Sequence, residues 1–428
     1  MMHFGLVCPG ISSHLYPMAA LGRELLKRGY QVTLFDIPDS LSRVQSEGLD
    51  FYPIGESDYP LGWALKFLKE ASELSGTEAS IFTQKAMGKH AGMVCRELPD
   101  ALREAGVGAL IVDQFEPAGA AVAEHLELPF ISLCSAVAFN LEGEKDLPAF
   151  FTSKLPKSSW RSRLGNQLDA QIWEIASSPT LKAINKHRHR WGLSQYKRFD
   201  DSFSRLAQIS QQAAAFDFPR TNVPKNFHFV GPIRNQSPYS VAFPYEKLTG
   251  QPLIYASMGT FQSRHLGIFQ TIAEACVNLD CQLILSLGGR TSTHEIPSLM
   301  GTPLVVDYAP QADLLSRAKL CITHAGMNTA LESLSYGVPM VAIPITNDQP
   351  GVAARIAYTG TGEVIPLKKL NPSDLRKVIE RVLTQDSYRQ AALRMKEHIQ
   401  QSVGVARAAD IVETVISSKK PVAPRIRG

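Results

Sequence analysis

The sequence lacks several features that would assign a protein to a class at once. Its six cysteines form no Cys-x-x-Cys pair, and most of them fall in apolar, strand-like runs, which predicts buried free thiols in a reducing cytosol. No apolar run reaches the roughly 18 residues that span a bilayer. The first residues also lack the charged and apolar regions of a signal peptide, so we expect a cytoplasmic protein.

A strong net charge is also missing. The chain has 44 Lys and Arg against 40 Asp and Glu, an excess too small to imply a nucleic-acid partner by itself. Residues 151–200 are the exception, because ten Lys and Arg stand against three Asp and Glu there. The aromatic residues in or beside this window are Phe150, Phe151, Trp160, Trp173 and Trp191. Such a mixture suits an anionic membrane surface, so peripheral membrane contact is expected; a solvated helical face with a few core aromatics is the alternative.

The glycine pattern of dinucleotide-binding enzymes is absent as well. The turn after the first predicted strand, residues 8–13, does not contain G-x-G-x-x-G. Asp36 ends the second predicted strand, where a ribose-binding acid of such an enzyme would lie, but one acid is weak support. A nicotinamide oxidoreductase is therefore disfavoured.

What the chain does contain is two series of short apolar strands separated by helical segments. Its 428 residues allow two domains with proper cores, and β-α-β units imply parallel sheets. We predict an α/β protein with two Rossmann-like, doubly wound domains that face each other across a cleft. The expected parts are an N-terminal domain at 1–235, a linker at 236–250, a C-terminal domain at 251–400, a helix at 401–418 that packs back on the N-terminal domain, and a flexible tail at 419–428.

The most informative stretch, residues 308–349, contains hydrogen-bond donors where a predicted strand turns into a helix. His324, Asn328 and Thr329 follow the strand, and Gly326 is expected to let the chain turn. Asn328 is expected to cap the helix that follows. Because a helix N-terminus binds anions, these residues predict a diphosphate site.

A carboxylate and an aromatic ring complete this predicted nucleotide site. Glu332 lies one helical turn further on and can accept hydrogen bonds from ribose hydroxyls. Tyr308 precedes Pro310, so its ring lies on a restrained loop and can stack on a base. A plain helix cap with a buried tyrosine is the alternative for the single residues, but it does not explain the whole set.

This stretch resembles the nucleotide-sugar signature of the glycosyltransferases that act on small lipophilic acceptors. Plant members have Trp at the positions of Tyr308 and Met327, whereas the Tyr-Ala-Pro-Gln form at 308–311 is more similar to bacterial carotenoid glucosyltransferases. The resemblance covers nearly the whole chain and implies the GT-B fold. It assigns uracil to Tyr308 and Gln311, ribose to Glu332, and sugar hydroxyls to Asp348 and Gln349. The full UDP-sugar set it implies is Ser257, Gly259, Thr260, Tyr308, Gln311, His324, Gly326, Asn328, Thr329, Glu332, Asp348 and Gln349.

The predicted catalytic pair is His14 with Asp113. Both follow predicted strands of the first sheet, so both side chains can reach the cleft. A carboxylate on one imidazole nitrogen fixes the tautomer and raises the basicity of the other, which makes His14 a candidate general base. A polar surface histidine and a loop-capping aspartate are the structural alternatives. The family uses this pair for catalysis, although Ser13 stands where its members usually have Gly.

The resemblance implies an inverting displacement that needs neither a metal nor a cofactor beyond the UDP-glucose donor. The chain contains no Asp-x-Asp, the pair with which metal-dependent glycosyltransferases commonly bind their ion. Retaining enzymes of this plan have a second Glu eight residues after the first, but Met340 occupies that position.

Three N-terminal stretches, 95–99, 112–119 and 206–220, resemble the carotenoid glucosyltransferases in particular. The expected acceptor is therefore a lipophilic hydroxylated molecule, with a carotenoid such as zeaxanthin as the first choice. Three alternatives stay open: a broad-specificity transferase for flavonoids, sterols or polyketides; more remotely, a UDP-sugar epimerase of the same fold; and a non-catalytic module that binds sugar nucleotides.

Overall fold

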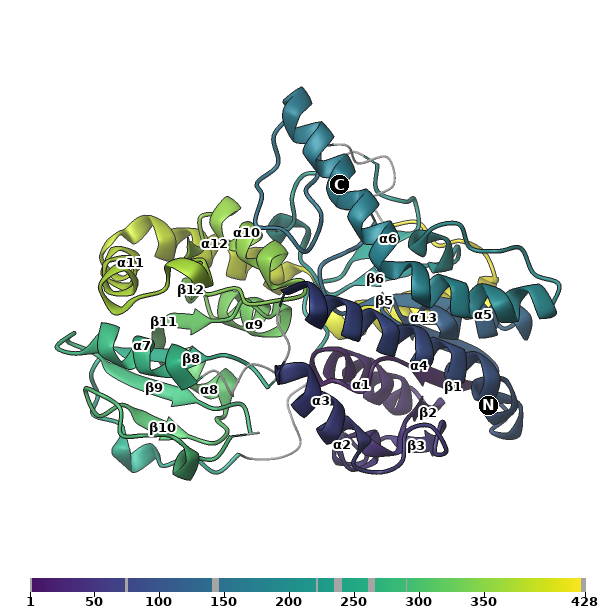
Figure 1. Cartoon of the computed structure of the whole chain (residues 1–428), viewed down its shortest axis with the longest axis horizontal. Helices are drawn as coiled ribbons and strands as arrows, with labels where there is room; N and C mark the ends of the chain where they lie inside the picture. Colours follow the sequence, from purple (N-terminus) through teal and green to yellow (C-terminus); the bar gives the residue numbers. More distant parts are fainter. Residues whose placement is uncertain are drawn as a thin grey trace.

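The computed structural model contains two separate parallel β-sheets, each covered by helices on both faces (Figure 1). It describes residues 2–73, 76–140, 146–220, 222–234, 241–260, 266–289 and 291–424. The two sheets lie side by side, and the chain enters the second after completing the first. The α/β fold class with two doubly wound domains is therefore confirmed.

The first sheet has seven parallel strands in the order β3-β2-β1-β4-β5-β6-β7. Its strands are β1 (His3–Val7), β2 (Gln31–Asp36), β3 (Asp50–Pro53), β4 (Ala109–Asp113), β5 (Phe130–Cys134), β6 (Gln208–Ser210) and β7 (Phe227–Phe229). The central strands are continuous apolar runs because helices bury them on both sides. The strand order reverses between β1 and β4, and such a switch point leaves a crevice at the carboxyl ends of the strands.

The second sheet repeats this plan with six strands in the order β10-β9-β8-β11-β12-β13. They are β8 (Leu253–Ser257), β9 (Gln282–Ser286), β10 (Leu304–Val306), β11 (Ala318–Thr323), β12 (Met340–Ala342) and β13 (Gly362–Val364). Here the order reverses between β8 and β11, so a second crevice lies at the ends of those two strands.

The helices fill the connections between strands. Those of the first half are α1 (Ser12–Lys27), α2 (Leu41–Ser46), α3 (Trp63–Glu73), α4 (Gly76–Glu104), α5 (Pro117–His125) and α6 (Trp160–Arg190). Those of the second half are α7 (Leu266–Cys276), α8 (Gln311–Arg317), α9 (Met327–Ser335), α10 (Gln349–Tyr358), α11 (Pro372–Thr384), α12 (Asp386–Gln401) and α13 (Gly404–Ser418). Short 3₁₀ turns lie at Pro38–Ser40, Phe199–Ser202, Ala214–Phe216, Tyr245–Lys247, Thr293–Glu295 and Leu367–Lys369.

The last helix returns to the first sheet. Ile411, Val412 and Val415 of α13 are buried in the same apolar cluster as the core of α1. Arg28 at the end of α1 donates to Asp410 at 2.8 Å and to Glu413 at 2.7 Å. The amino-terminal and carboxyl-terminal segments of the chain therefore belong to one layer.

Residues beyond α13 continue along this layer. The sequence predicts a flexible tail at 419–428, but the Val422 amide donates to the Leu206 carbonyl at 2.9 Å, and His228 contacts the Val422 carbonyl. Residues 425–428, like 236–240 of the predicted linker, lie outside the described residues.

The basic window is largely one long helix, α6, which begins at the top of Figure 1 and projects beyond the sheets. Ser159 caps it by accepting from the Ser162 amide. The aromatic residues expected on its surface mostly lie elsewhere: Phe150 is buried, Trp173 packs on the core cluster, and Trp191 stacks on a neighbouring ring. Of these aromatic residues only Trp160 is strongly exposed, at 70%, and the expected membrane contact stays a prediction.

None of the helices that the structure describes combines the length and the apolar character needed to cross a membrane. All six cysteines are free and five of them are buried, as the apolar runs around them predict.

Candidate active site

The predicted catalytic pair meets at the switch point of the first sheet. His14 lies in the first turn of α1 and Asp113 ends β4, and Nδ1 of the histidine is 2.9 Å from Oδ1 of the aspartate. Asp113 also accepts from the Ser135 hydroxyl at 2.7 Å and from the Phe115 amide at 2.8 Å. The carboxylate is therefore fixed in place, and Nε2 of His14 is left to take a proton.

The surroundings of His14 make it a stronger base than a free imidazole. Burial lowers the pKa of its ring, but the charge and hydrogen bond of Asp113, with smaller contributions from Asp348 and Glu116, outweigh this and raise it above the usual value. His14 is only 6% exposed, so these charges act on it through protein and not through water.

Asn328 connects the two halves of the site. It lies in the first turn of α9, where its Nδ2 donates to the Ser13 carbonyl at 3.1 Å and its Oδ1 accepts from Gln211 at 2.8 Å. The prediction that Asn328 caps this helix is wrong, because the N-cap is Gly326. The amide side chain instead reaches across the interface to the residue before His14.

His324 is enclosed by glycines. A Cβ atom at Gly259 would lie 2.5 Å from its Cε1, and one at Gly326 would lie 2.6 Å from its Nε2. Gly326 has a φ of −67°, so it is needed for this close approach and not for a left-handed turn. That turn falls on Ala325, whose φ is +65°.

The buried ring of His324 is uncharged near neutral pH. Burial lowers its pKa to about 4, although a hydrogen bond with the Ser257 backbone acts in the opposite direction. Its Nδ1 is buried and has no hydrogen-bond partner. Because a neutral imidazole has one N–H, His324 can give a diphosphate at most one hydrogen bond and no charge.

The start of α9 supplies further donors to the same place. Its N-cap, Gly326, offers no side chain to the first amides of the helix, and unpaired amides of this kind bind anions. Thr329 is buried in the first turn, and Ser257 at the end of β8 accepts from the Gly259 amide at 3.3 Å. Thr260 follows in the same loop. The switch point of the second sheet therefore has the features of an anion site.

Glu332 and Gln311 contact each other. Gln311 Nε2 donates to Glu332 Oε2 at 2.6 Å, and its Oε1 accepts from the Tyr255 hydroxyl at 3.2 Å. Arg234 pairs with the other carboxylate oxygen of Glu332 at 3.2 Å. Each carboxylate oxygen has a second acceptor site, so Glu332 can still accept from a ribose hydroxyl.

Tyr308 forms the edge of this region. Its side chain is 47% exposed and packs near Gly289, where an added Cβ would be 3.4 Å from the ring. Burial, followed by the charge of Tyr16 and a hydrogen bond to it, raises the pKa of Tyr308 above the usual value. Base stacking on this ring stays a prediction.

The predicted sugar-binding pair begins α10. Asp348 accepts from the Val137 amide at 3.4 Å, and burial raises the pKa of its carboxyl group, against the opposing effect of His14. Gln349 Oε1 accepts from the Ile345 and Thr346 amides, so only its Nε2 is left to donate to a sugar. Asp348 therefore lies close enough to His14 for each to affect the pKa of the other.

A buried ion triad, which sequence reasoning missed, holds α10 against the first half. Arg355 donates to Asp217 at 2.8 Å, and Arg220 donates to the other oxygen of Asp217 at 2.7 Å. Arg220 also donates to the Asn140 and Ala138 carbonyls. Burial raises the pKa of Asp217, but the positive charges of Arg355 and Arg220 outweigh this effect and hold the pKa below its usual value. The motif at 217–220 was noticeable in the sequence, but nothing near Arg355 indicated its partner.

Aromatic rings form an apolar wall beside His14. Phe115 meets the imidazole edge-on at 4.9 Å between ring centroids, and Phe139 packs on Phe115 at 4.1 Å. Phe150 and Trp173 extend the cluster towards α6. Phe139 and Phe150 are buried in the core, whereas Phe115, next to His14, is partly exposed.

The geometry agrees with comparisons to known proteins. The model of the family "UDP-glucoronosyl and UDP-glucosyl transferase" matches residues 6–416. The chain is 35% identical to the zeaxanthin glucosyltransferase of Pantoea ananas over 99% of this chain and 98% of that protein. It is 34% identical to the zeaxanthin glucosyltransferase of Pseudescherichia vulneris over 99% of this chain and all of that protein. The solved glycotransferase of kitacinnamycin has the same fold, with a TM-score of 0.75 at 20% identity over 96% and 98% of the two chains.

The family match covers almost the whole chain, and the two sheets with a site between them form the GT-B arrangement of glycosyltransferases. The protein therefore belongs to the UDP-glucoronosyl and UDP-glucosyl transferase family and is a UDP-glycosyltransferase with the GT-B fold.

Proposed function

We propose that this enzyme transfers glucose from UDP-glucose to a hydroxyl group of a lipophilic acceptor, with a hydroxylated carotenoid such as zeaxanthin as the physiological one. The observation that carries the proposal is the buried His14–Asp113 pair at 2.9 Å, next to the apolar wall of Phe115 and Phe139. The two relatives named above as zeaxanthin glucosyltransferases support the choice of acceptor.

The proposed reaction is a direct displacement. Nδ1 of His14 donates to Asp113, so Nε2 removes the proton from the acceptor hydroxyl as its oxygen attacks the anomeric carbon. The bond from that carbon to the diphosphate oxygen breaks, UDP leaves, and the configuration inverts. Asp113 stabilises the imidazolium that forms, which then releases its proton to solvent.

The second half of the site holds the donor. The open amides at the start of α9 stabilise the charge that develops on the diphosphate, and His324 adds at most one N–H. Asp348 and Gln349 bind sugar hydroxyls, while Glu332 accepts from the ribose at the acceptor sites that Arg234 and Gln311 leave open. We also propose that the reaction needs no metal ion. The support is that the sequence contains no Asp-x-Asp pair.

A product analysis tests the proposal. The purified enzyme is given UDP-glucose with a panel of hydroxylated carotenoids, flavonoids and sterols, and products are identified by mass. We expect a hexose added to zeaxanthin at a higher kcat/KM than to the other acceptors, and a β-linkage by NMR. Equal rates across the panel would favour the broad-specificity alternative, and interconversion of UDP-sugars without an acceptor would favour the epimerase.

Metal dependence and inversion are tested in the same assay. Activity should persist in EDTA, because the displacement described above uses only protein groups. An α-linked product from the α-linked donor would contradict the displacement even if transfer itself occurred.

A further inference from the structure

The outward face of α6 carries an exposed apolar stripe that the fold leaves uncovered. The exposed fractions are 70% for Trp160, 51% for Leu164, 52% for Leu168, 56% for Ile172 and 74% for Ile175. At 100° per residue these positions lie within an arc of about 120° and extend over roughly 22 Å of the helix. Single exposed apolar residues are ordinary, but a contiguous stripe marks an interaction surface.

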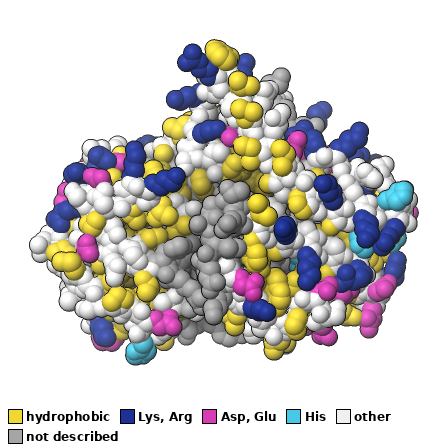
Figure 2. All heavy atoms as spheres, in the orientation of Figure 1, with side chains coloured by type: hydrophobic (Ala, Val, Ile, Leu, Met, Phe, Trp, Pro, Cys, Tyr) yellow, Lys and Arg dark blue, Asp and Glu magenta, His cyan; other side chains and the backbone are white. Residues whose placement is uncertain are grey.

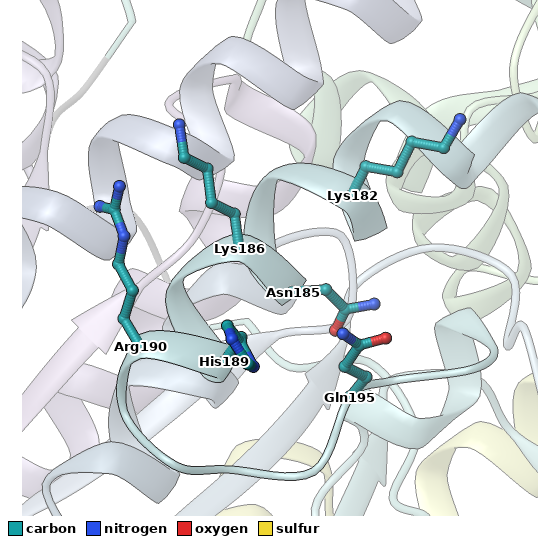
Figure 3. Close-up of a pocket in the computed structure, with 6 residues that line it drawn as sticks. All are labelled: Lys182, Asn185, Lys186, His189, Arg190 and Gln195. Carbon is teal, nitrogen blue, oxygen red and sulfur yellow. The ribbon is translucent and has the colours of Figure 1, made fainter.

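The same face becomes cationic further along the helix. Lys182, Lys186 and Arg190 are exposed and fall within the same arc. Figure 3 shows these three side chains extending away from Asn185 and Gln195, which line the same shallow pocket. None of the three forms an ion pair within the described part of the chain, whereas Lys154 and Arg163 near the other end do.

We propose that this α6 face is a docking surface for an anionic lipid bilayer. The α6 face is defined as Trp160, Leu164, Leu168, Ile172, Ile175, Lys182, Lys186 and Arg190. The helix lies in the plane of the membrane interface, with its apolar half among the upper acyl chains and its cationic half on lipid phosphates. The choice of lipid rests on the proposed function, because a carotenoid acceptor is dissolved in membranes.

Charge complementarity favours lipid over other occupants. Figure 2 shows hydrophobic and Lys or Arg side chains side by side at the top of the molecule, where α6 begins. Burial is the largest cause of the lowered pKa of the neighbouring His187, and the charges of Arg190 and Lys186 act in the same direction. A second copy of the chain would bring the same cations with it, whereas an anionic bilayer neutralises them.

The opposite face of this helix leads to the catalytic base. Trp173 points inward from α6 and packs on Phe150 and Phe139, and Phe139 contacts Phe115 beside His14. A continuous series of aromatic contacts therefore connects α6 to the catalytic histidine.

Vesicle flotation of the full-length protein tests the docking surface without donor or acceptor. We expect flotation with vesicles of phosphatidylcholine and 30% phosphatidylglycerol, and little with phosphatidylcholine alone. The variant Ile172→Ser/Ile175→Ser should bind at least about tenfold more weakly. Lys182→Gln/Lys186→Gln/Arg190→Gln should lose about fivefold per cation at low salt.

Two matched variants control for nonspecific effects. Leu61→Ser/Leu65→Ser removes side chains that are 80% and 70% exposed elsewhere on the same half, and Lys368→Gln/Lys369→Gln removes exposed cations from the other half. Both should float like the original protein. The proposal is overturned if the unmodified protein ignores anionic vesicles, if the α6 variants float normally, or if light scattering shows a dimer that Ile172→Ser/Ile175→Ser dissociates.

Transfer to a detergent-dispersed acceptor is measured in parallel. It should be unchanged in the α6 variants, since detergent delivers the acceptor without docking. Flotation without any transfer would contradict the proposed function but not the docking surface. Transfer without flotation would contradict the docking surface but not the proposed function.

Discussion

At the scale of single residues, His14 is held in a state suited to proton abstraction. Asp113 fixes its tautomer through a 2.9 Å contact and helps to raise its pKa above the usual value. In the proposed reaction the neutral ring is the active form, so kcat/KM should rise with pH until His14 is fully deprotonated. The rising limb should lie above the pH at which a free imidazole titrates.

The variants His14→Ala and Asp113→Asn test this assignment. His14→Ala should lower kcat by about 10²–10⁴-fold while UDP affinity, measured by calorimetry, stays the same. Asp113→Asn removes the negative charge that raises the pKa of His14, so the rising limb should move to lower pH and kcat should fall. A limb that does not move in Asp113→Asn would show that another group titrates.

A substitution at Gly259 tests how closely the loop after β8 packs against His324. Its φ is +69°, and an added Cβ would lie 2.5 Å from the His324 ring. Gly259→Ala should displace that ring and cost about 1–3 kcal/mol of UDP binding through lost hydrogen bonds. Gly29→Ala is the control, because Gly29 has a φ of +87° but no atom within 4 Å of its Cβ position. It should lose some stability and keep UDP affinity; equal losses of affinity in both variants would contradict the role of the contact.

At the scale of elements, α10 depends on a residue from the other half of the chain. Arg355 on this helix pairs with Asp217 at 2.6 Å, and both side chains are at most 3% exposed. Removing one partner from a buried pair costs about 3–5 kcal/mol, because the other charge is left uncompensated. The start of this helix carries Asp348 and Gln349, so the pair positions the proposed sugar contacts.

Asp217→Asn should therefore raise KM for UDP-glucose more than it lowers kcat, as shown by initial rates at varied donor concentration. The matched control is Lys377→Ala, which breaks the exposed pair with Asp374 on α11 and should leave both KM and the unfolding midpoint unchanged. A lower unfolding midpoint with an unchanged donor KM would show that the triad serves stability alone.

Much of the element order follows from the sequence, and the exceptions have physical reasons. The central strands were predictable because burial on both faces makes them continuous apolar runs, as in β4 and β8. The strands β3, β6, β7 and β13 were not predicted, because each has only three or four residues and includes a polar side chain, such as Asp50, Gln208 or His228. In such short strands, neighbouring strands determine the pairing more than local preference does.

The candidate site also contains residues that could be placed from the sequence and contacts that could not. His14, Asp113 and the residues around His324 follow strands and could be placed at strand ends from the sequence. The contacts that join the two halves could not, because Asn328 with Ser13 and Arg355 with Asp217 are separated by 315 and 138 residues. Local patterns also suggested a cap for Asn328, and only tertiary packing shows that it reaches across the interface.

At the scale of the whole molecule, the buried triad predicts that both sheets unfold together. All four tryptophans lie between residues 63 and 191, so their fluorescence reports the first sheet, whereas circular dichroism reports both. In urea the two signals should change at one midpoint. The double variant Asp217→Asn/Arg355→Met should separate them, and two midpoints in the unmodified protein would contradict this coupling.

The return of α13 to the first layer has a consequence for how this enzyme can recombine with its relatives. Arg28 of α1 meets Asp410 and Glu413 of α13, so the half with the first sheet is built from two segments that lie far apart in the sequence. A single crossover near residue 240 would join this half to a foreign α13. A functional hybrid needs a second crossover near residue 403, and the half with the second sheet is therefore exchanged as an internal cassette.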